Sequence, residues 1–167
     1  MKADKKFLII GNKNAFTYKE IFKLIKENKI WVGYTQPKNF RLEDGTTTKK
    51  VNGLTRWFTN MTTVKREEEF VFTREYNAID YPKYDNYDAI EVNKVVSIPD
   101  NYYKPMGVPI TFLDKYNPNQ FEILGHTTSS DKSPEVEELR TNPKYRSAGR
   151  INGKAKYHRI FIRRKKI

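Results

Sequence analysis

The sequence contains no cysteine, so disulfides and every metal site that needs a thiolate ligand are excluded. Histidine is scarce as well, because only His126 and His158 occur, and their separation matches no metal-ligand spacing. A catalytic triad would require one of these histidines, and neither has an evident partner in the sequence. We therefore assign neither histidine a catalytic role.

Glycine-rich phosphate-binding loops are missing too, because neither GxGxxG nor GxxxxGK[ST] occurs. The longest apolar stretches, such as residues 7–10 (FLII), are far shorter than the roughly 20 residues that span a bilayer. No apolar signal-peptide core follows Met1. We therefore expect a cytoplasmic protein without a membrane partner.

Positive charge dominates the composition. The chain of 167 residues has 32 Lys and Arg against 20 Asp and Glu, which gives a net charge of +12. A basic domain of this size indicates a polyanionic partner, most often nucleic acid. The alternative is a basic surface that only promotes solubility. Aromatic residues make up 14% of the chain, so it has the material for a folded core.

The first part of the chain has the pattern of a strand–helix–strand unit. The apolar run at 7–10 predicts a buried parallel strand, which ends in a Gly-Asn-Lys-Asn loop at 11–14. Thr17 and Glu20 form a capping box before an apolar helical face, and residues 30–34 (IWVGY) predict the next strand. Such a crossover joins parallel strands, and ligands bind in the loops at their carboxyl ends.

From residue 35 onward the sequence is typical of a β-rich region. Stretches 54–61 and 69–75 are strand-like and are separated by a polar connection, which predicts an antiparallel pair. Short strands are also expected at 89–92 (AIEV), 109–113 (PITFL) and 121–124 (FEIL).

The last two of these strands should be joined by an exposed corner at 114–120. Pro134 should start a short helix, and residues 158–164 (HRIFIRR) alternate apolar and basic residues, as a half-exposed strand does. We expect one compact domain, with 1–34 as its strand–helix–strand part and 35–167 as its β-rich part.

A second function class is suggested by carboxylates near the tyrosine-rich stretch 81–88. Asp80, Asp85, Asp88 and Glu91 cluster loosely there, and metal-dependent nucleases use clustered acids. No motif fixes a catalytic pair among them, so the alternative is a set of exposed acids in a basic domain.

The basic residues are more informative, because many of them fall in one carboxyl-terminal segment. Tyr145 and Tyr157 lie among them, and interleaved tyrosines and cations suit contacts with phosphates and bases. Arg56, next to Trp57 and Phe58, is a separate candidate, although these two aromatic residues are equally suited to a core. The basic residues of the segment are Arg140, Lys144, Arg146, Arg150, Lys154, Lys156, Arg159, Arg163 and Arg164.

Several long blocks resemble the EcoRI-type adenine-specific DNA methyltransferase family. They occur in the expected order over nearly the whole chain, and the similarity is weakest at 35–53 and 127–150. The blocks are residues 5–34, 56–60 (RWFTN), 81–95, 107–125 (GVPITFLDKYNPNQFEILG) and 151–165 (INGKAKYHRIFIRRK).

The resemblance implies an enzyme of a restriction–modification system that methylates adenine in double-stranded DNA with S-adenosylmethionine. In this family a cofactor-binding half comes first, followed by an Asn-Pro-Pro-Phe-type motif that holds the flipped adenine. Our sequence contains neither that motif nor a cofactor glycine loop, so it resembles the carboxyl-terminal half alone. The implied fold is a mixed, β-rich α/β fold, in which the second half of a Rossmann-like sheet precedes an antiparallel β-rich DNA-recognition region.

The resemblance also implies the site residues. Gly11, Asn12, Lys13 and Asn14 would border the target-base pocket, and Lys115 in the 107–125 block joins Arg56 and the basic carboxyl-terminal residues as a DNA-contact candidate. No catalytic residue and no metal ligand can be carried over. S-adenosylmethionine is expected to bind the intact family enzyme but not this chain alone.

Three functions remain open from the sequence. The chain is the DNA-facing half of an adenine methyltransferase, a non-catalytic nucleic-acid-binding module descended from one, or a metal-dependent nuclease. Half of a doubly wound sheet would expose an edge and apolar faces. Besides DNA, we therefore expect a separate cofactor-binding half or self-association to cover that surface.

Overall fold

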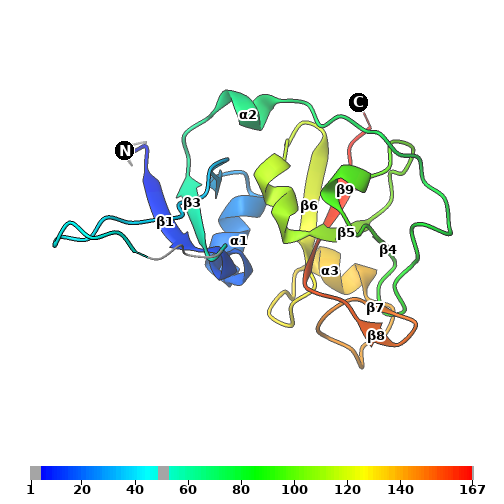
Figure 1. The fold of residues 1–167 in the computed structure, drawn as a ribbon. Helices are drawn as coiled ribbons and strands as arrows, with labels where there is room; N and C mark the ends of the chain where they lie inside the picture. Colours follow the sequence, from blue (N-terminus) through cyan, green and yellow to red (C-terminus); the bar gives the residue numbers. More distant parts are fainter. Residues whose placement is uncertain (1–4, 49–52, 167) are drawn as a thin grey trace. The chain divides into compact units, whose positions relative to one another are not determined.

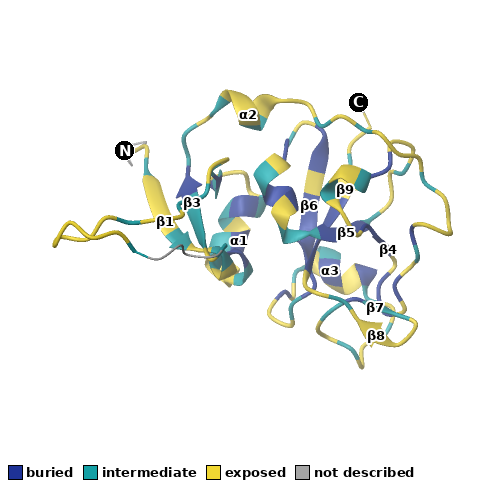
Figure 2. Cartoon of the chain, in the orientation of Figure 1, coloured by how far each residue is buried: buried dark blue, intermediate teal, exposed yellow. Residues whose placement is uncertain are grey.

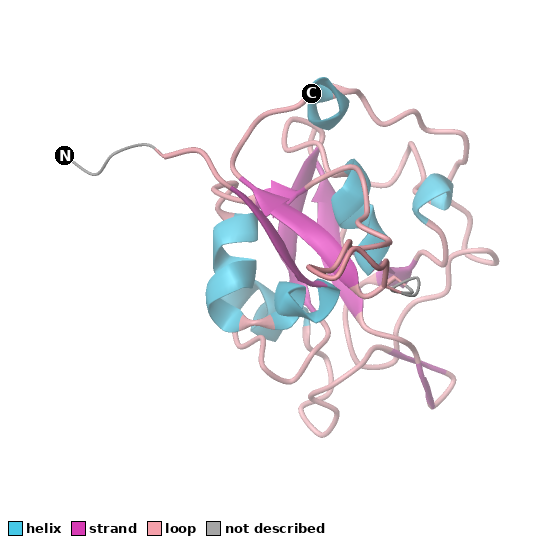
Figure 3. Ribbon diagram, turned by 60° about the vertical axis from the view of Figure 1, so that its left-hand side comes forward, coloured by secondary structure: helices cyan, strands magenta, loops and turns pink. Residues whose placement is uncertain are grey.

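Short strands and long loops dominate the computed structural model, which describes residues 5–48 and 53–166 (Figure 3). Internal contacts divide the chain into residues 1–67, here called unit 1, and residues 68–167, called unit 2. The boundary that we expected after residue 34 therefore falls inside unit 1. Taken together, the described elements are mixed and β-rich, as the sequence predicts.

Unit 1 contains a three-stranded sheet of β1 (Leu8–Asn12), β2 (Trp31–Val32) and β3 (Thr55–Thr59). Both β1 and β2 pair antiparallel with β3, which lies between them, so β1 and β2 run parallel to each other. Figure 1 shows β1 beside β3. The predicted pairing of 54–61 with 69–75 is wrong. Residues 69–75 form no strand, and their one bridge joins Arg74 to Pro99.

Helical residues connect the parallel strands of unit 1. The short 3₁₀ helix η1 (Lys13–Thr17) follows β1 and leads into α1 (Lys19–Lys26), and α2 (Val64–Glu67) follows β3. Phe22 and Ile25 of α1 are buried, which confirms the apolar helical face. The predicted capping box is wrong, because Thr17 belongs to η1 and its hydroxyl donates to the Asn14 carbonyl oxygen (2.8 Å).

The first strand differs most from its prediction. Leu8, Ile9 and Ile10 are 51%, 56% and 41% exposed, although their sequence is typical of a buried strand (Figure 2). The reason is topological, since among the described residues β1 has only β3 as a neighbour and lies at an edge of the sheet. Unit 1 therefore presents an apolar strand edge to solvent.

Unit 2 is built around a sheet of β4 (Ile90–Glu91), β5 (Met106–Pro109), β6 (Phe121–His126) and β9 (Arg159–Arg164). The order is β4-β5-β9-β6; β4 and β5 are parallel, and β9 is antiparallel to both of its neighbours. The prediction of a half-exposed strand at 158–164 is wrong, because β9 is central and is buried from Arg159 to Ile162.

The connections of unit 2 are the 3₁₀ helices η2 (Val95–Ser97) and η3 (Ile110–Lys115), the helix α3 (Pro134–Leu139) and the hairpin strands β7 (Arg150–Ile151) and β8 (Lys154–Ala155). Pro134 starts α3, as predicted. The predicted strand at 109–113 is mostly η3 instead, whereas 121–124 does lie in a strand. Among the residues described, no helix has the length and apolar character of a membrane span.

The corner at 114–120 is partly buried rather than exposed, because its amide side chains bind a neighbouring segment. The Gln120 side chain accepts from the Phe70 amide (2.5 Å) and donates to the Phe70 carbonyl oxygen (3.2 Å). Asn117 is also buried and donates to the Glu68 carbonyl oxygen (3.2 Å). These bonds supply residues 68–70 with partners that a sheet neighbour would otherwise provide.

A buried ion pair joins β4 to β9 across β5. Arg159 donates to the Glu91 carboxylate through Nη2 (2.6 Å) and Nε (3.0 Å), and the Tyr84 hydroxyl donates to the same carboxylate. The Glu91 side chain is fully buried and that of Arg159 is 10% exposed. Gly107 of β5 leaves the space that this group occupies, since a Cβ there would collide with the Tyr84 ring and hydroxyl.

We predict that Glu91→Gln lowers the free energy of unfolding by about 3–5 kcal/mol, because it leaves the Arg159 guanidinium buried without a countercharge. The matched control is Glu122→Gln, which removes an exposed partner of Arg163 and should cost less than about 1 kcal/mol. Equilibrium urea unfolding followed by far-ultraviolet circular dichroism measures both. Equal effects of the two substitutions would contradict this role of the buried pair.

Candidate nucleic-acid interface

The basic, turn-rich segment 142–157 is held against unit 2 by a buried amide. Asn86 is fully buried, and its Oδ1 accepts from the Arg150 amide (2.8 Å). Its Nδ2 donates to the carbonyl oxygens of Ala148 (3.0 Å) and Tyr145 (3.4 Å). One side chain therefore fixes the backbone at three points of the segment, which is ordered by the protein and is not a loose basic tail.

The hairpin of β7 and β8 is fixed at its tip as well (Figure 1, lower right). Asn152 and Gly153 form its two-residue turn, with φ angles of 51° and 75°, as type I′ hairpin turns require. The Asp85 carboxylate accepts from the Asn152 amide (3.2 Å) and the Gly153 amide (2.7 Å). The Asn-Gly pair signals the turn in the sequence, but nothing there identifies Asp85 as its partner.

Besides Arg150, which is described below, four of the predicted DNA-contact residues in this segment form no ion pair with any described carboxylate. Lys144, Arg146 and Lys154 are exposed and Lys156 is half-buried. Tyr157, next to Lys156, is 88% exposed. Cations of this kind can bind phosphate oxygens without first giving up a carboxylate. We call these four residues the open cations.

Four predicted arginines are instead paired with carboxylates of unit 2. Arg159 is buried on Glu91, and the Arg140 side chain is only 4% exposed. Arg164 also lies over the Phe72 ring, 4.0 Å from its centroid. These arginines stabilise the fold of unit 2, and Arg159 has almost no accessible surface that could contact a phosphate. The pairs are Arg140–Glu137 (3.3 Å), Arg159–Glu91 (2.6 Å), Arg163–Glu122 (2.8 Å) and Arg164–Asp100 (2.6 Å).

The other candidates differ in setting. Arg150 braces the hairpin, because its Nη1 donates to the Gly153 carbonyl oxygen (2.7 Å) and its guanidinium lies 4.4 Å from the centroid of the Tyr145 ring. Arg56 lies on β3 of unit 1, half-buried, and donates to the Thr55 carbonyl oxygen (2.9 Å). It therefore belongs to a different unit from the open cations.

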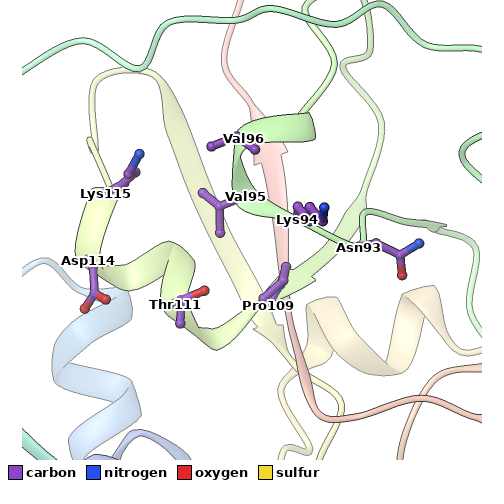
Figure 4. A pocket seen from close by; sticks show the side chains of 8 residues that line it. All are labelled: Asn93, Lys94, Val95, Val96, Pro109, Thr111, Asp114 and Lys115. Atoms are coloured by element: carbon purple, nitrogen blue, oxygen red, sulfur yellow. The ribbon is translucent and has the colours of Figure 1, made fainter. Parts of the chain in front are cut away.

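Lys115 is exposed and lines a pocket of about 430 Å³ on unit 2. Figure 4 shows its lining side chains, which come from the segments 93–96 and 109–115. Val95, Val96 and Pro109 give it apolar walls, while Lys94, Lys115 and Asp114 give it both signs of charge. This mixture of charges does not define a site for phosphate.

The residues predicted to border a target base lie at the end of β1 in unit 1. The Asn12 side chain accepts from the Asn14 amide (2.8 Å), and the Lys13 amide donates to the Leu54 carbonyl oxygen (2.7 Å). Gly11 pairs with Arg56 of β3. Because these amides are already bonded, the turn offers no cradle of backbone donors for an anion.

The acids that suggested a nuclease have structural partners. Asp85 binds the hairpin turn and Glu91 binds Arg159. Asp80 accepts from Asn77 (2.8 Å), and Asp88 lies 3.8 Å from the Lys83 ammonium. In the described part of the chain, no group of three or more potential ligands could hold a metal ion. The described residues therefore offer no metal site of the kind that a metal-dependent nuclease needs.

Comparison with known proteins decides the family. The family model described as "Adenine-specific methyltransferase EcoRI" matches residues 1–165. The chain belongs to this family. The EcoRI-type resemblance seen in the sequence is thereby confirmed.

The curated relatives of this EcoRI-type chain are much longer than the chain itself. Type II methyltransferase M.EcoRI of Escherichia coli is 42% identical, over 100% of this chain and 52% of the relative. M.MpnI of Mycoplasma pneumoniae is 35% identical, over 96% and 57%, and M.MgeORF184P of Mycoplasma genitalium is 34% identical, over 98% and 58%. The chain thus spans about half the length of each. No solved structure matches it.

His126 in this EcoRI-type chain is a packed residue. It is 5% exposed, and its Nδ1 accepts from the Thr128 amide (3.3 Å). Burial lowers the pKa of His126, and the charge of His158 lowers it further, while the Asp131 carboxylate opposes the shift. The imidazole is therefore neutral in the folded protein near pH 7.

A lowered folded-state pKa means that the unfolded chain binds the proton more tightly. We predict that the free energy of unfolding falls as the pH drops below about 6.5, the ordinary histidine value, and that His126→Asn reduces this fall because asparagine does not titrate. Thermal unfolding of both proteins between pH 8 and pH 5.5 measures the effect. Parallel pH profiles would rule out His126 as the cause.

Proposed function

We propose that this chain is the DNA-facing, target-recognition part of an adenine-specific DNA methyltransferase of a restriction–modification system. The observation that carries the proposal is the separation of its basic residues. The arginines of β9, and Arg140 directly after α3, are paired with carboxylates, whereas the open cations Lys144, Arg146, Lys154 and Lys156 lie together on one anchored segment. Phosphate contacts by such residues position a protein on a duplex.

We also propose that unit 1 is one end of a methyltransferase sheet. Its parallel strands β1 and β2 are joined through α1, and the antiparallel β3 lies between them. Mixed sheets are common among doubly wound α/β folds, where the antiparallel strand usually lies at an edge, whereas β3 here is the middle strand of the three. In this account the turn after β1, from Gly11 to Asn14, borders the target base.

The residues of this chain do not fit S-adenosylmethionine, so we propose that the cofactor binds only in the intact family enzyme. The sequence has no glycine-rich loop and no Asn-Pro-Pro-aromatic motif. The turn after β1 has its amides bonded within unit 1. Methyl transfer would therefore require groups that these residues do not supply, and the chain alone should be inactive.

The exposed strand β1 indicates where the cofactor-binding part would attach. Its sequence, Leu8-Ile9-Ile10, is typical of a buried parallel strand, yet these side chains are exposed at a free sheet edge. In the curated relatives, about half of the residues lie outside the region that matches this chain. We propose that the cofactor-binding half of the enzyme covers this edge with a strand of its own.

The DNA-binding proposal predicts salt-sensitive binding of duplex DNA that depends on the open cations. Replacing Arg146, Lys154 and Lys156 with alanine should reduce the slope of log K against log salt concentration by about 2–3. Fluorescence anisotropy of a labelled duplex between 50 and 200 mM salt measures this slope. Methylation of the duplex by the chain alone with S-adenosylmethionine would contradict the claim of inactivity.

The control removes the same charge from residues that have carboxylate partners. Lys23 and Lys29 lie 3.9 and 2.6 Å from Glu27, and Arg163 lies 2.8 Å from Glu122. Their triple alanine variant should keep a slope near that of the unaltered chain. If both triple variants weaken binding equally, net charge alone explains the binding and the open cations do not form a site.

The attachment proposal predicts that the isolated chain associates through β1 when its companion is absent. Ile9→Lys should shift the chain toward a monomer in sedimentation velocity, because it places a charge on the apolar edge. Ile79→Lys is the matched control, since Ile79 is 93% exposed on unit 2 and should not change association. A monomeric unaltered chain at high micromolar concentration would count against an apolar docking edge.

A further inference from the structure

The hairpin of β7 and β8 stands apart from the other basic features because its tip is both exposed and rigid. Asn152, Gly153, Lys154 and Ala155 are all exposed. The turn is nevertheless held by the Asp85 carboxylate, and the Asp85 amide donates to the Arg150 carbonyl oxygen (2.8 Å). The backbone of such a fixed tip is positioned before any ligand arrives.

The base of the hairpin is anchored in the core of unit 2. Ile151 packs against a buried cluster that includes Tyr84, Tyr87 and Phe161. The Lys156 amide closes the base by donating to the Gly149 carbonyl oxygen (2.8 Å), and Gly149 is fixed beside Tyr84, whose ring leaves no room for a Cβ. The hairpin therefore moves with the sheet and not as an independent loop.

The tip carries groups that can read bases. The Asn152 side chain makes no hydrogen bond to another described residue, and Lys154 forms no ion pair there. A side-chain amide matches the donor and acceptor pattern of adenine in the major groove, and a lysine ammonium matches the acceptors of guanine. Lys144, Arg146 and Lys156, on the flanks, are suited to the phosphates beside the groove.

The width of the hairpin selects the groove. A two-stranded β-ribbon fits the major groove of B-DNA, which is about 12 Å wide, but not the minor groove of about 6 Å. Resting on the proposed DNA-binding function, we propose that the β7–β8 hairpin enters the major groove and that Asn152 and Lys154 determine sequence specificity there. Asp85 is the positioning residue that holds the tip.

The experiment is selection of bound duplexes from a pool with randomised base pairs, followed by sequencing. The unaltered chain should enrich a motif. Asn152→Gly combined with Lys154→Ala should lose about 5- to 100-fold of the discrimination at one or two positions of that motif. Glycine at 152 keeps the left-handed turn, so the hairpin should survive. Lys144→Ala with Arg146→Ala is the control and should weaken binding while enriching the same motif.

Two further measurements distinguish base recognition by the hairpin from effects on its folding and on the net charge of the chain. Purines replaced by their 7-deaza analogues at the affected positions lack the major-groove N7 acceptor. They should weaken binding by the unaltered chain but not by the Asn152/Lys154 variant. Asp85→Asn makes the chain more positive, so non-specific binding should strengthen while discrimination falls. If Asp85 acted only through its charge, non-specific binding would strengthen but discrimination between sequences would not fall. If Asp85 only stabilised the fold, non-specific binding and discrimination would both weaken.

The outcomes distinguish this inference from the proposed function. If no duplex is bound in a salt-dependent way, both fail. If duplexes are bound but no motif is enriched, or if the Asn152/Lys154 variant enriches the same motif as the unaltered chain, the hairpin does not read bases and the DNA-binding proposal stands. Insensitivity of the unaltered chain to 7-deazapurines would likewise overturn entry into the major groove.

Discussion

The arrangement of unit 2 depends on the buried ion pair between Glu91 and Arg159. It connects β4 with β9 across β5, and the Tyr84 hydroxyl completes the set of donors to the carboxylate. Burial raises the pKa of Tyr84, with the Glu91 charge adding to the shift, so the hydroxyl remains a donor. Two buried charges are tolerable only when paired and hydrogen-bonded in this way. Tyr84 in turn packs beside Gly149, which brings the start of the hairpin onto the same core.

The same few interactions link the core to the surface that we propose for DNA. Three consecutive residues, 84–86, make hydrogen bonds to three different features. Tyr84 bonds the buried ion pair, Asp85 bonds the hairpin turn, and Asn86 bonds the backbone of residues 145–150. A binding surface on a loop is effective when a rigid scaffold positions it. Carboxylate pairing then decides which basic residues remain at that surface, because a paired arginine loses part of its capacity to bind phosphate.

Local patterns in the sequence predicted the elements that depend on local interactions. The helix at Pro134, the apolar face of α1 and the strand at 121–124 are examples, and the family followed from long blocks of similar sequence. Interactions between distant residues were missed. The alternation in 158–164 suggested a half-exposed strand, but Glu91, which neutralises Arg159, lies far away in the chain. Likewise, β1 has a buried strand's sequence, and only the topology shows that its edge is open.

We propose that segment 142–157, and not the carboxylate-paired arginines of β9, faces DNA. The most direct measurement is residue-resolved NMR mapping of amide shifts as a duplex is added to the chain. If segment 142–157 faces DNA, the largest shifts fall within residues 142–157, while Glu91 and Arg159 to Ile162 stay nearly unchanged. The largest shifts on β9 or in the pocket beside Lys94 and Lys115, with segment 142–157 unaffected, would contradict it.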